Sequence, residues 1–166
     1  MTLLDAPAYD AARARRIRIA LYSGVGLCFV LFVAGWFVAG RPVDWPWNWW
    51  THFRGRAVTN SFFQAVERND MQQAYGIWTH DPVWQQHLQQ HGAYPFSRFQ
   101  QDWGPNSAQN DYGTIRSHKI AAARISGNVL ILGVYINGQK SNAIFLDYDP
   151  HDHTLGFSPV QLYLGP

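Results

Sequence analysis

The sequence predicts a small α+β domain behind one membrane-spanning helix. An uncharged apolar segment from Ile19 to Gly40 predicts the span. Apolar residues at helical spacing between Thr51 and Gly104 predict three or four helices. Strand-forming residues separated by turn signals fill most of the chain after Thr114. Helices followed by an antiparallel meander indicate a layer of helices packed on one face of a sheet.

The apolar segment 19–40 is long enough to cross a bilayer as a helix. At about 1.5 Å per residue it spans roughly 33 Å, against a hydrocarbon core of about 30 Å. A helix is required because lipid offers no hydrogen-bond partner to backbone groups. The alternative is a cleaved signal peptide ending near Val38-Ala39-Gly40, whose apolar core would be shorter, about 7–15 residues. We therefore expect an uncleaved signal anchor.

The charges that flank the span predict its direction. The arginines that precede it are Arg13, Arg15, Arg16 and Arg18. Beyond the span, Arg41 lies close to Asp44 in the sequence, and the next basic residue is Arg54. The positive-inside bias therefore predicts a cytoplasmic tail over residues 1–18 and a periplasmic domain, with the helix in the inner membrane.

Residues 41–50 form a tryptophan-rich linker. Its indoles are those of Trp45, Trp47, Trp49 and Trp50. An indole is apolar in its body and polar at its N–H, so it suits the boundary between lipid and water. We expect these residues to lie at the membrane interface, and a tryptophan-lined sugar or peptide site is the alternative.

Composition excludes several classes of function. Aromatic residues make up 16% of the chain and charged residues 14%, and the basic and acidic side chains from Thr51 onward cancel. A nucleic-acid-binding domain would need a concentrated basic face. The single cysteine, Cys28, permits neither an intramolecular disulfide nor a thiolate zinc site. Lipidation of Cys28 is conceivable, but Leu27 precedes it where a lipoprotein signal has a small residue, so we expect a lipid-facing side chain.

Capping residues divide the helical half of the domain. A first helix is expected from Thr51 to Arg68, with an apolar stripe at Val58, Phe62, Ala65 and Val66. Asp70 can cap a second helix. A third is expected from Asp81-Pro82, with proline in the first turn, to Gly92, and a fourth from Pro95 to Gly104-Pro105.

The second half has the composition of an antiparallel sheet. Strands are expected at 114–126, 129–136 and 141–148, and a last one at 155–163. Gly127-Asn128 turns the chain after the first strand. Asn137-Gly138 is a favourable two-residue hairpin turn because both residues tolerate positive φ.

Residues 62–70 (FFQAVERND) and 71–75 (MQQAY) carry a resemblance to a known family. This stretch resembles the opening of nuclear-transport-factor-two-like domains, in which a first helix ends in a polar turn with Asp and a short second helix carries an Ala-Tyr pair. The order of elements from Thr51 to Leu164 is similar as well. The resemblance implies a cone of the cystatin-like type over residues 51–166, with a curved sheet wrapped around helices. The family includes enzymes and non-catalytic scaffolds, so the fold alone does not give the function.

In an enzyme of the cone type, a carboxylate or histidine beside a tyrosine would line the pocket and move a proton. The candidates here are Tyr75, Asp102, Tyr112 and His118. Buried tyrosines with satisfied hydroxyls and an aspartate at a helix end are the structural alternative. No catalytic residue is transferred from the family, because its positions do not match residue by residue.

Two histidine-containing groups raise the question of a metal. His87 and His91 have the spacing of neighbours on one helix face, but no glutamate or third ligand accompanies them. A second group surrounds one turn and consists of Asp147, Asp149, His151, Asp152 and His153. It lacks the glycine and terminal glutamate of a calcium loop. We expect neither a metal nor a cofactor.

Two functional hypotheses fit these features. The first is a non-catalytic, membrane-tethered interaction or assembly module that contacts the bilayer and a membrane-protein partner or another copy of itself. Its low charge and many aromatic residues are typical of interfaces. The second is a cone-pocket binder of small molecules, or an enzyme of the isomerase or hydrolase type, which requires a deep cavity with polar groups in an apolar wall.

Overall fold

The computed structural model describes residues 10–164. The chain forms two compact units, Met1–Val38 and Ala39–Pro166, and each is described by itself. Of the predicted cytoplasmic tail, residues 1–9 lie outside the described part.

The first unit is the long helix α1, Ala11–Val38. It begins where the Asp10 carboxylate accepts the backbone N–H groups of Ala12 and Arg13, each at 3.0 Å. The helix starts before the predicted span because arginine is a good helix former. No residue of α1 is buried within the described structure. Its length and apolar composition make it able to cross a membrane, as the sequence predicts.

The tryptophan-rich segment belongs to the second unit, where it folds onto the first turn of α2. A short 3₁₀ helix, η2, covers Pro46–Asn48 and leads directly into α2, Trp49–Glu67. The Trp49 indole N–H donates to the carbonyl of Asp44 at 3.1 Å, and His52 Nε2 lies 2.6 Å from the Asp44 carboxylate. Asp44 thereby fixes the segment to α2.

The first two helices predicted for the domain are confirmed as α2 and α3. The buried residues of α2 include Phe62, Phe63 and Val66, which form one stripe. The chain reverses at Asn69, whose φ is 58°. The Asp70 side chain then accepts the N–H of Gln73 at 3.0 Å and caps α3, Met71–Trp78.

The predicted third helix from Asp81 to Gly92 is wrong. Only the 3₁₀ turn η3, Trp84–Gln86, is helical there, and the rest is turns and coil. The Asp81 carboxylate caps the Val83 N–H at 3.0 Å, but no continuous apolar stripe comes after it to hold a longer helix against the sheet. The fourth helix is confirmed as α4, Phe96–Trp103, which ends at Gly104.

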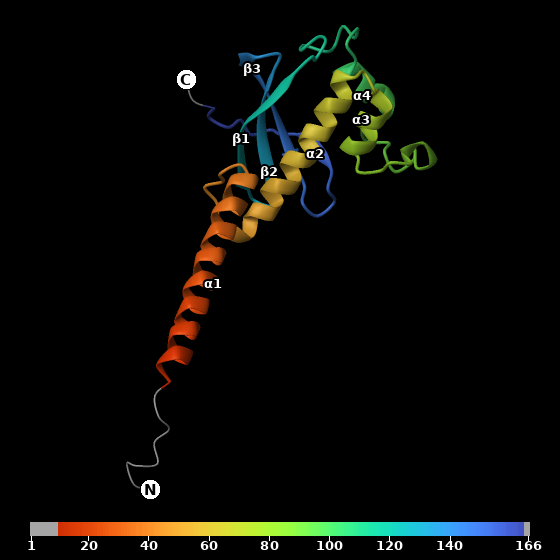
Figure 1. Ribbon diagram of the computed structural model, residues 1–166. Coiled ribbons are helices and arrows are strands. Elements are labelled where there is room, and N and C mark those ends of the chain that lie inside the picture. The colour runs from red at the N-terminus through yellow and green to blue at the C-terminus, as the bar shows by residue number, and fades with distance from the viewer. Residues whose placement is uncertain (1–9, 165–166) are drawn as a thin grey trace. The chain divides into compact units, whose positions relative to one another are not determined.

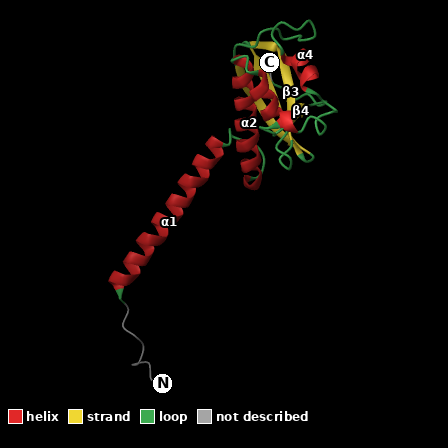
Figure 2. Ribbon diagram, turned by 90° about the vertical axis from the view of Figure 1, so that its right-hand side faces the viewer, coloured by secondary structure: helices red, strands yellow, loops and turns green. Residues whose placement is uncertain are grey.

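Within the described residues, the sheet has four antiparallel strands in the order β1-β2-β3-β4. They are β1 His118–Ser126, β2 Val129–Ile136, β3 Gln139–Tyr148 and β4 Leu155–Phe157. The pairing of β1 with β2 shifts between Ile120 and Ala122, which marks a bulge. Asn137 and Gly138 have φ of 53° and 74°, as the predicted hairpin turn requires. Figures 1 and 2 show α2 beside the strands, against which it packs.

The last strand is shorter than predicted. It ends at Phe157 because the chain continues into Ser158-Pro159, and proline cannot donate to a ladder. The residues after it run over the face of the sheet opposite to α2. There the Tyr135 hydroxyl donates to the Leu164 carbonyl at 3.4 Å, and a Cβ placed on Gly133 would lie only 2.7 Å from Leu164 Cδ2. The side chain of Leu164 therefore covers Gly133.

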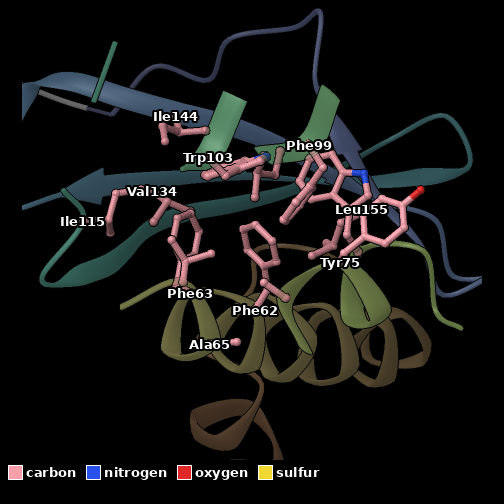
Figure 3. Packing of buried hydrophobic residues seen from close by; sticks show 14 of the residues in the cluster. Phe62, Phe63, Ala65, Tyr75, Phe99, Trp103, Ile115, Val134, Ile144 and Leu155 are labelled. Atoms are coloured by element: carbon pink, nitrogen blue, oxygen red, sulfur yellow. The ribbon is translucent and has the colours of Figure 1, made fainter. Parts of the chain in front are cut away.

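Aromatic side chains fill the space between the helices and the sheet. Figure 3 shows Phe62 and Phe63 rising from α2 towards the strands, with Phe99 and Trp103 above them. Phe62 is completely buried, and its ring lies 4.9 Å from that of Trp103 in an edge-to-face arrangement. Leu130, Leu132, Val134 and Ile136 of β2 close the core from the sheet side. The predicted α+β class is confirmed, and the interior is a packed core.

Candidate functional site: a groove between α2 and α3

A concavity of the second unit lies outside the packed core. It is a partly open groove of about 890 Å³ between α2 and α3, completed by η3 and by the turn after β3. The helical contributors recur at helix spacing, as Phe53, Ala57 and Ser61 on α2 and Gln73, Ile77 and His80 at and after α3. One face of each helix is thus exposed to the groove.

The walls of the groove are apolar. They consist of Phe53, Ala57, Val58, Ile77, Pro82 and Trp84. Trp84 is held rigidly, because its indole N–H donates to the Gln72 carbonyl at 3.3 Å and its ring packs edge-on against Tyr75. A Cβ on Gly76 would lie 3.1 Å from the Asp81 carbonyl, so glycine lets the loop approach α3 closely. The loop that failed to form the predicted third helix is therefore the outer wall of the groove.

One end of the groove is rich in hydrogen-bonding and basic groups. Tyr148 at the end of β3 has its hydroxyl 2.7 Å from His153 Nδ1, in a hydrogen bond whose direction depends on the histidine tautomer. The His80 ring lies 5.1 Å from the His153 ring. The exposed Arg54 extends from α2 beside them, and its guanidinium carbon is 5.5 Å from the centre of the Trp50 ring.

Burial dominates the electrostatics of this end. It raises the pKa of Tyr148, while a hydrogen bond and the positive charge of Arg54 oppose the rise. The Tyr148 hydroxyl is therefore neutral at physiological pH and acts as a hydrogen-bonding group. Within residues 10–164, no carboxylate lies within ion-pair distance of Arg54. The end can therefore receive an anion.

Polar, mostly uncharged side chains also line the groove. They are Ser61, Asp70, Gln72, Gln73 and Gln85. The Asp70 carboxylate is already engaged by the N–H of Gln73 as the cap of α3. Amide side chains along a rim suit hydrogen bonding to a peptide backbone, which carries both donors and acceptors.

A carboxylate and two histidines fix the loop that forms the outer wall. Asp81 Oδ2 lies 3.0 Å from His91 Nε2 and 2.8 Å from His87 Nδ1. The hydrogen bond from His91, with that from His87 and the Val83 N–H, lowers the pKa of Asp81 to about 2. His87 and His91 do not share a helix face as predicted, but both reach this one side chain.

The predicted pocket residues do not converge on a cavity. The Tyr75 hydroxyl donates to the Tyr94 carbonyl at 2.7 Å, and the Tyr94 hydroxyl donates to the Asp102 carboxylate at 2.8 Å. Arg98 completes this chain with an ion pair to Asp102 at 3.3 Å. Tyr75 and Asp102 are thus linked through Tyr94 in a network that ties α3 to α4.

The other two predicted pocket residues lie elsewhere. His118 at the start of β1 stacks on Phe63, with Nδ1 2.7 Å from Glu67 Oε1 and Nε2 3.1 Å from Asn60 Oδ1. It fastens the sheet to α2. Tyr112 is half-buried against the core, and burial raises its pKa.

The predicted membrane-interface residues are mostly exposed. Trp45 and Trp47 stack with their ring centres 5.1 Å apart, and both are exposed, as is Trp50. Trp49 is instead half-buried and bound to Asp44. The predicted arginines, Arg13, Arg15, Arg16 and Arg18, all lie in the N-terminal part of α1.

No set of three metal-ligating side chains is gathered in the described part of the chain. In the turn after β3, His151 pairs with Asp152, while His153 turns to Tyr148. The sequence pattern raised His153 only as a possible metal ligand, which was not expected, and it gave no sign of Arg54, His80 or Tyr148 as groove residues. These residues come from separate elements, so no local spacing could have grouped them.

No protein-family model, curated protein or solved structure matches the chain.

Proposed function

We propose that the chain is a non-catalytic, single-pass membrane-tethered interaction module of the cell envelope. In this proposal α1 anchors the protein, and the second unit binds a protein partner through the groove between α2 and α3.

The groove is the observation that carries this proposal. It is an apolar, preformed concavity with polar ends on the surface of a domain whose charges nearly cancel. The surfaces that proteins use for binding combine an apolar centre with a polar, weakly charged rim. A volume of about 890 Å³ exceeds what one or two side chains fill, so the groove suits several side chains of a partner segment.

The interior gives no comparable support to a cone-pocket enzyme or small-molecule binder. The space that would be the pocket holds the fully buried rings of Phe62, Phe63 and Phe99. The polar candidates Tyr75 and Asp102 are engaged in fixed hydrogen bonds. The resemblance to nuclear-transport-factor-two-like domains remains a prediction, and within that family the packed interior favours a scaffold over an enzyme.

The proposed direction places the N-terminus in the cytoplasm and the groove in the periplasm, with the helix in the inner membrane. The arginines at the start of α1 support this direction through the positive-inside bias. The exposed indoles of Trp45, Trp47 and Trp50 support contact with the lipid headgroups, because they come shortly after the end of α1 in the chain.

Single cysteines test the direction. In a Cys28→Ser background, Asn128→Cys is expected to react with a membrane-impermeant maleimide in intact spheroplasts. Asp10→Cys is expected to react only after lysis. The reverse pattern would refute the proposed direction, and a mature protein that lacks α1 would refute the anchor.

Photo-crosslinking tests the groove in the intact membrane. Gln85 lines the groove and is exposed, so p-benzoyl-phenylalanine at this position is expected to form a defined protein adduct. Asn128, exposed in the turn between β1 and β2, is the control position and is expected to give none. Equal adducts at both positions, or no adduct at Gln85, would contradict binding through the groove. An adduct of twice the chain's mass would identify the partner as another copy.

A further inference from the structure

We infer that the groove binds a protein segment that carries apolar side chains and one carboxylate, and that Arg54 binds this carboxylate. The inference rests on the proposed function and names the chemistry of the partner.

Arg54 has no anionic partner among the described residues. The guanidinium is exposed at the end of the groove and has no carboxylate partner within residues 10–164. Its guanidinium carbon lies 5.5 Å from the centre of the Trp50 ring, and its positive charge opposes the rise that burial causes in the pKa of Tyr148. An arginine beside neutral groups keeps its forked donors available for an oxyanion.

The neighbouring groups strengthen the same preference. His80 and His153 lie at this end of the groove, with their rings 5.1 Å apart. An imidazole donates through an N–H when neutral and through both ring nitrogens when protonated. Among the described residues that line the groove, the only carboxylate is that of Asp70, which caps α3. A ligand with a negative charge near Arg54 therefore meets hydrogen-bond donors.

The remainder of the groove selects for apolar groups. Its lining includes Val58, Ile77 and the indole of Trp84. Apolar side chains are stabilised when they leave water for such a wall. The glutamine-rich rim can meet polar backbone groups of the same ligand. Apolar side chains, a backbone and one terminal or side-chain carboxylate together describe a peptide segment.

Removal of the Arg54 charge, with a matched control in the full chain in its native membrane, tests the inference. Against the benzoyl-phenylalanine probe at Gln85, Arg54→Gln is expected to reduce the adduct about tenfold, as the loss of a charge-assisted hydrogen bond predicts. Arg124→Gln removes the same charge from the exposed surface of β1 and is expected to leave the adduct unchanged. Arg54→Lys keeps the charge but loses the planar guanidinium with its paired N–H donors, and it is expected to give an intermediate yield of the adduct. Equal melting temperatures for the four proteins exclude loss of folding.

Mass spectrometry of the adduct then gives the decisive result. The cross-linked partner peptide is expected to carry Asp, Glu or a C-terminal carboxylate within about one helical turn of apolar residues. Where the carboxylate is a side chain, its replacement by Lys, combined with Arg54→Glu in this chain, is expected to restore the adduct. For a C-terminal carboxylate, amidation of the synthetic partner peptide is expected to weaken its binding as much as Arg54→Gln does.

Four outcomes would overturn the inference. An adduct that forms equally with Arg54→Gln, or a partner peptide without any carboxylate near the cross-link, would leave the proposed function intact and refute only the role of Arg54. A small apolar acid that co-purifies with the chain, is detected by native mass spectrometry and is lost with Arg54→Gln would show that the ligand is not a peptide. Absence of any groove adduct in the unaltered chain would refute the proposed function itself.

Discussion

The interior of the second unit and the groove on its surface are built from the same two helices but differ in what covers them. On the inner side, Phe62 and Phe63 of α2 are fully buried against the sheet and α4. On the groove side, Phe53 of the same helix remains 40% exposed, and Val58 is half-buried. Both sides carry apolar residues, but only the inner side is closed by the described chain itself.

The difference shows that α2 carries more apolar surface than folding of the described chain requires. A helix on the surface of a domain usually has one apolar stripe and one polar face. In α2 the second apolar strip coincides with a cluster of hydrogen-bonding groups around Arg54 and Tyr148. Aromatic residues of the interior serve stability, and those of the groove are available for binding.

The interior side is expected to be far more sensitive to substitution than the groove wall. Phe62→Ala removes a ring that is in edge-to-face contact with Phe63 and Trp103, and it is expected to lower the free energy of unfolding by about 3–5 kcal/mol. Phe53→Ala, in the groove wall, is expected to cost about 1 kcal/mol or less. Urea titrations of the full chain in a nonionic detergent, followed by circular dichroism, measure both. Similar losses of unfolding free energy for the two variants would contradict this difference between the interior and the groove wall.

A smaller loss of stability is expected from a substitution on α2 where the interior and the groove wall meet. Gly55 lies on α2, and a Cβ there would be 2.5 Å from Leu130 Cδ2 and 2.9 Å from Tyr148 Cδ1. Because both neighbours are fully buried, Gly55→Ala is expected to destabilise the fold by about 1–3 kcal/mol despite the higher helix propensity of alanine. The same urea titrations measure this loss.

Gly55→Ala also affects the groove, because Tyr148 lines it. The variant is expected to reduce cross-linking at Gln85 through displacement of Tyr148. Gly92→Ala, where the nearest atom to the new Cβ is 3.6 Å away, is the matched control and is expected to change neither quantity. A Gly55→Ala chain as stable as the unaltered one would show that Leu130 and Tyr148 can shift freely.

The mildest change is expected in the loop that forms the outer wall of the groove. The pKa of Asp81 falls from its ordinary 3.8 to about 2 in the folded chain, through hydrogen bonds with His91, His87 and the Val83 N–H. A lowered folded-state pKa means that the carboxylate contributes stability above about pH 4 and loses this contribution as the pH falls through about 2. Asp81→Asn is therefore expected to lower the melting temperature at pH 5 and to make little difference at pH 2.

Asp111→Asn, at an exposed position, is the control for this pH series. For this variant, the difference in melting temperature between pH 5 and pH 2 is expected to equal that of the unaltered chain. If the difference in melting temperature between Asp81→Asn and the unaltered chain does not shrink towards pH 2, the stabilisation comes from packing and not from the carboxylate.

Local signals in the sequence predicted most of the fold. The Asp70 cap, the Asn137-Gly138 turn and the apolar run of β2 each act over a few residues, and the structure confirms all three. The proposed third helix failed because Asp81-Pro82 is an equally good start for a turn. The chain after this turn is held by contacts distant in sequence, including those of Trp84 with Tyr75 and Phe96.

The candidate site could not be predicted in the same way. Arg54, His80 and Tyr148 lie on α2, after α3 and at the end of β3, and only the tertiary fold brings them together. The residues chosen from the sequence, such as Tyr75 and His118, have the chemistry of a site but are used to hold elements together. In the sequence alone, a polar residue among apolar residues looks the same whether it belongs to a binding site or holds two elements of the fold together.

The covering of Gly133 by Leu164 has a consequence for folding during synthesis. The outer face of β2 lacks this cover until the residues after β4 have left the ribosome, since Leu164 belongs to that segment. During that interval the nascent domain exposes an incomplete sheet, which is the kind of surface that a holding chaperone shields.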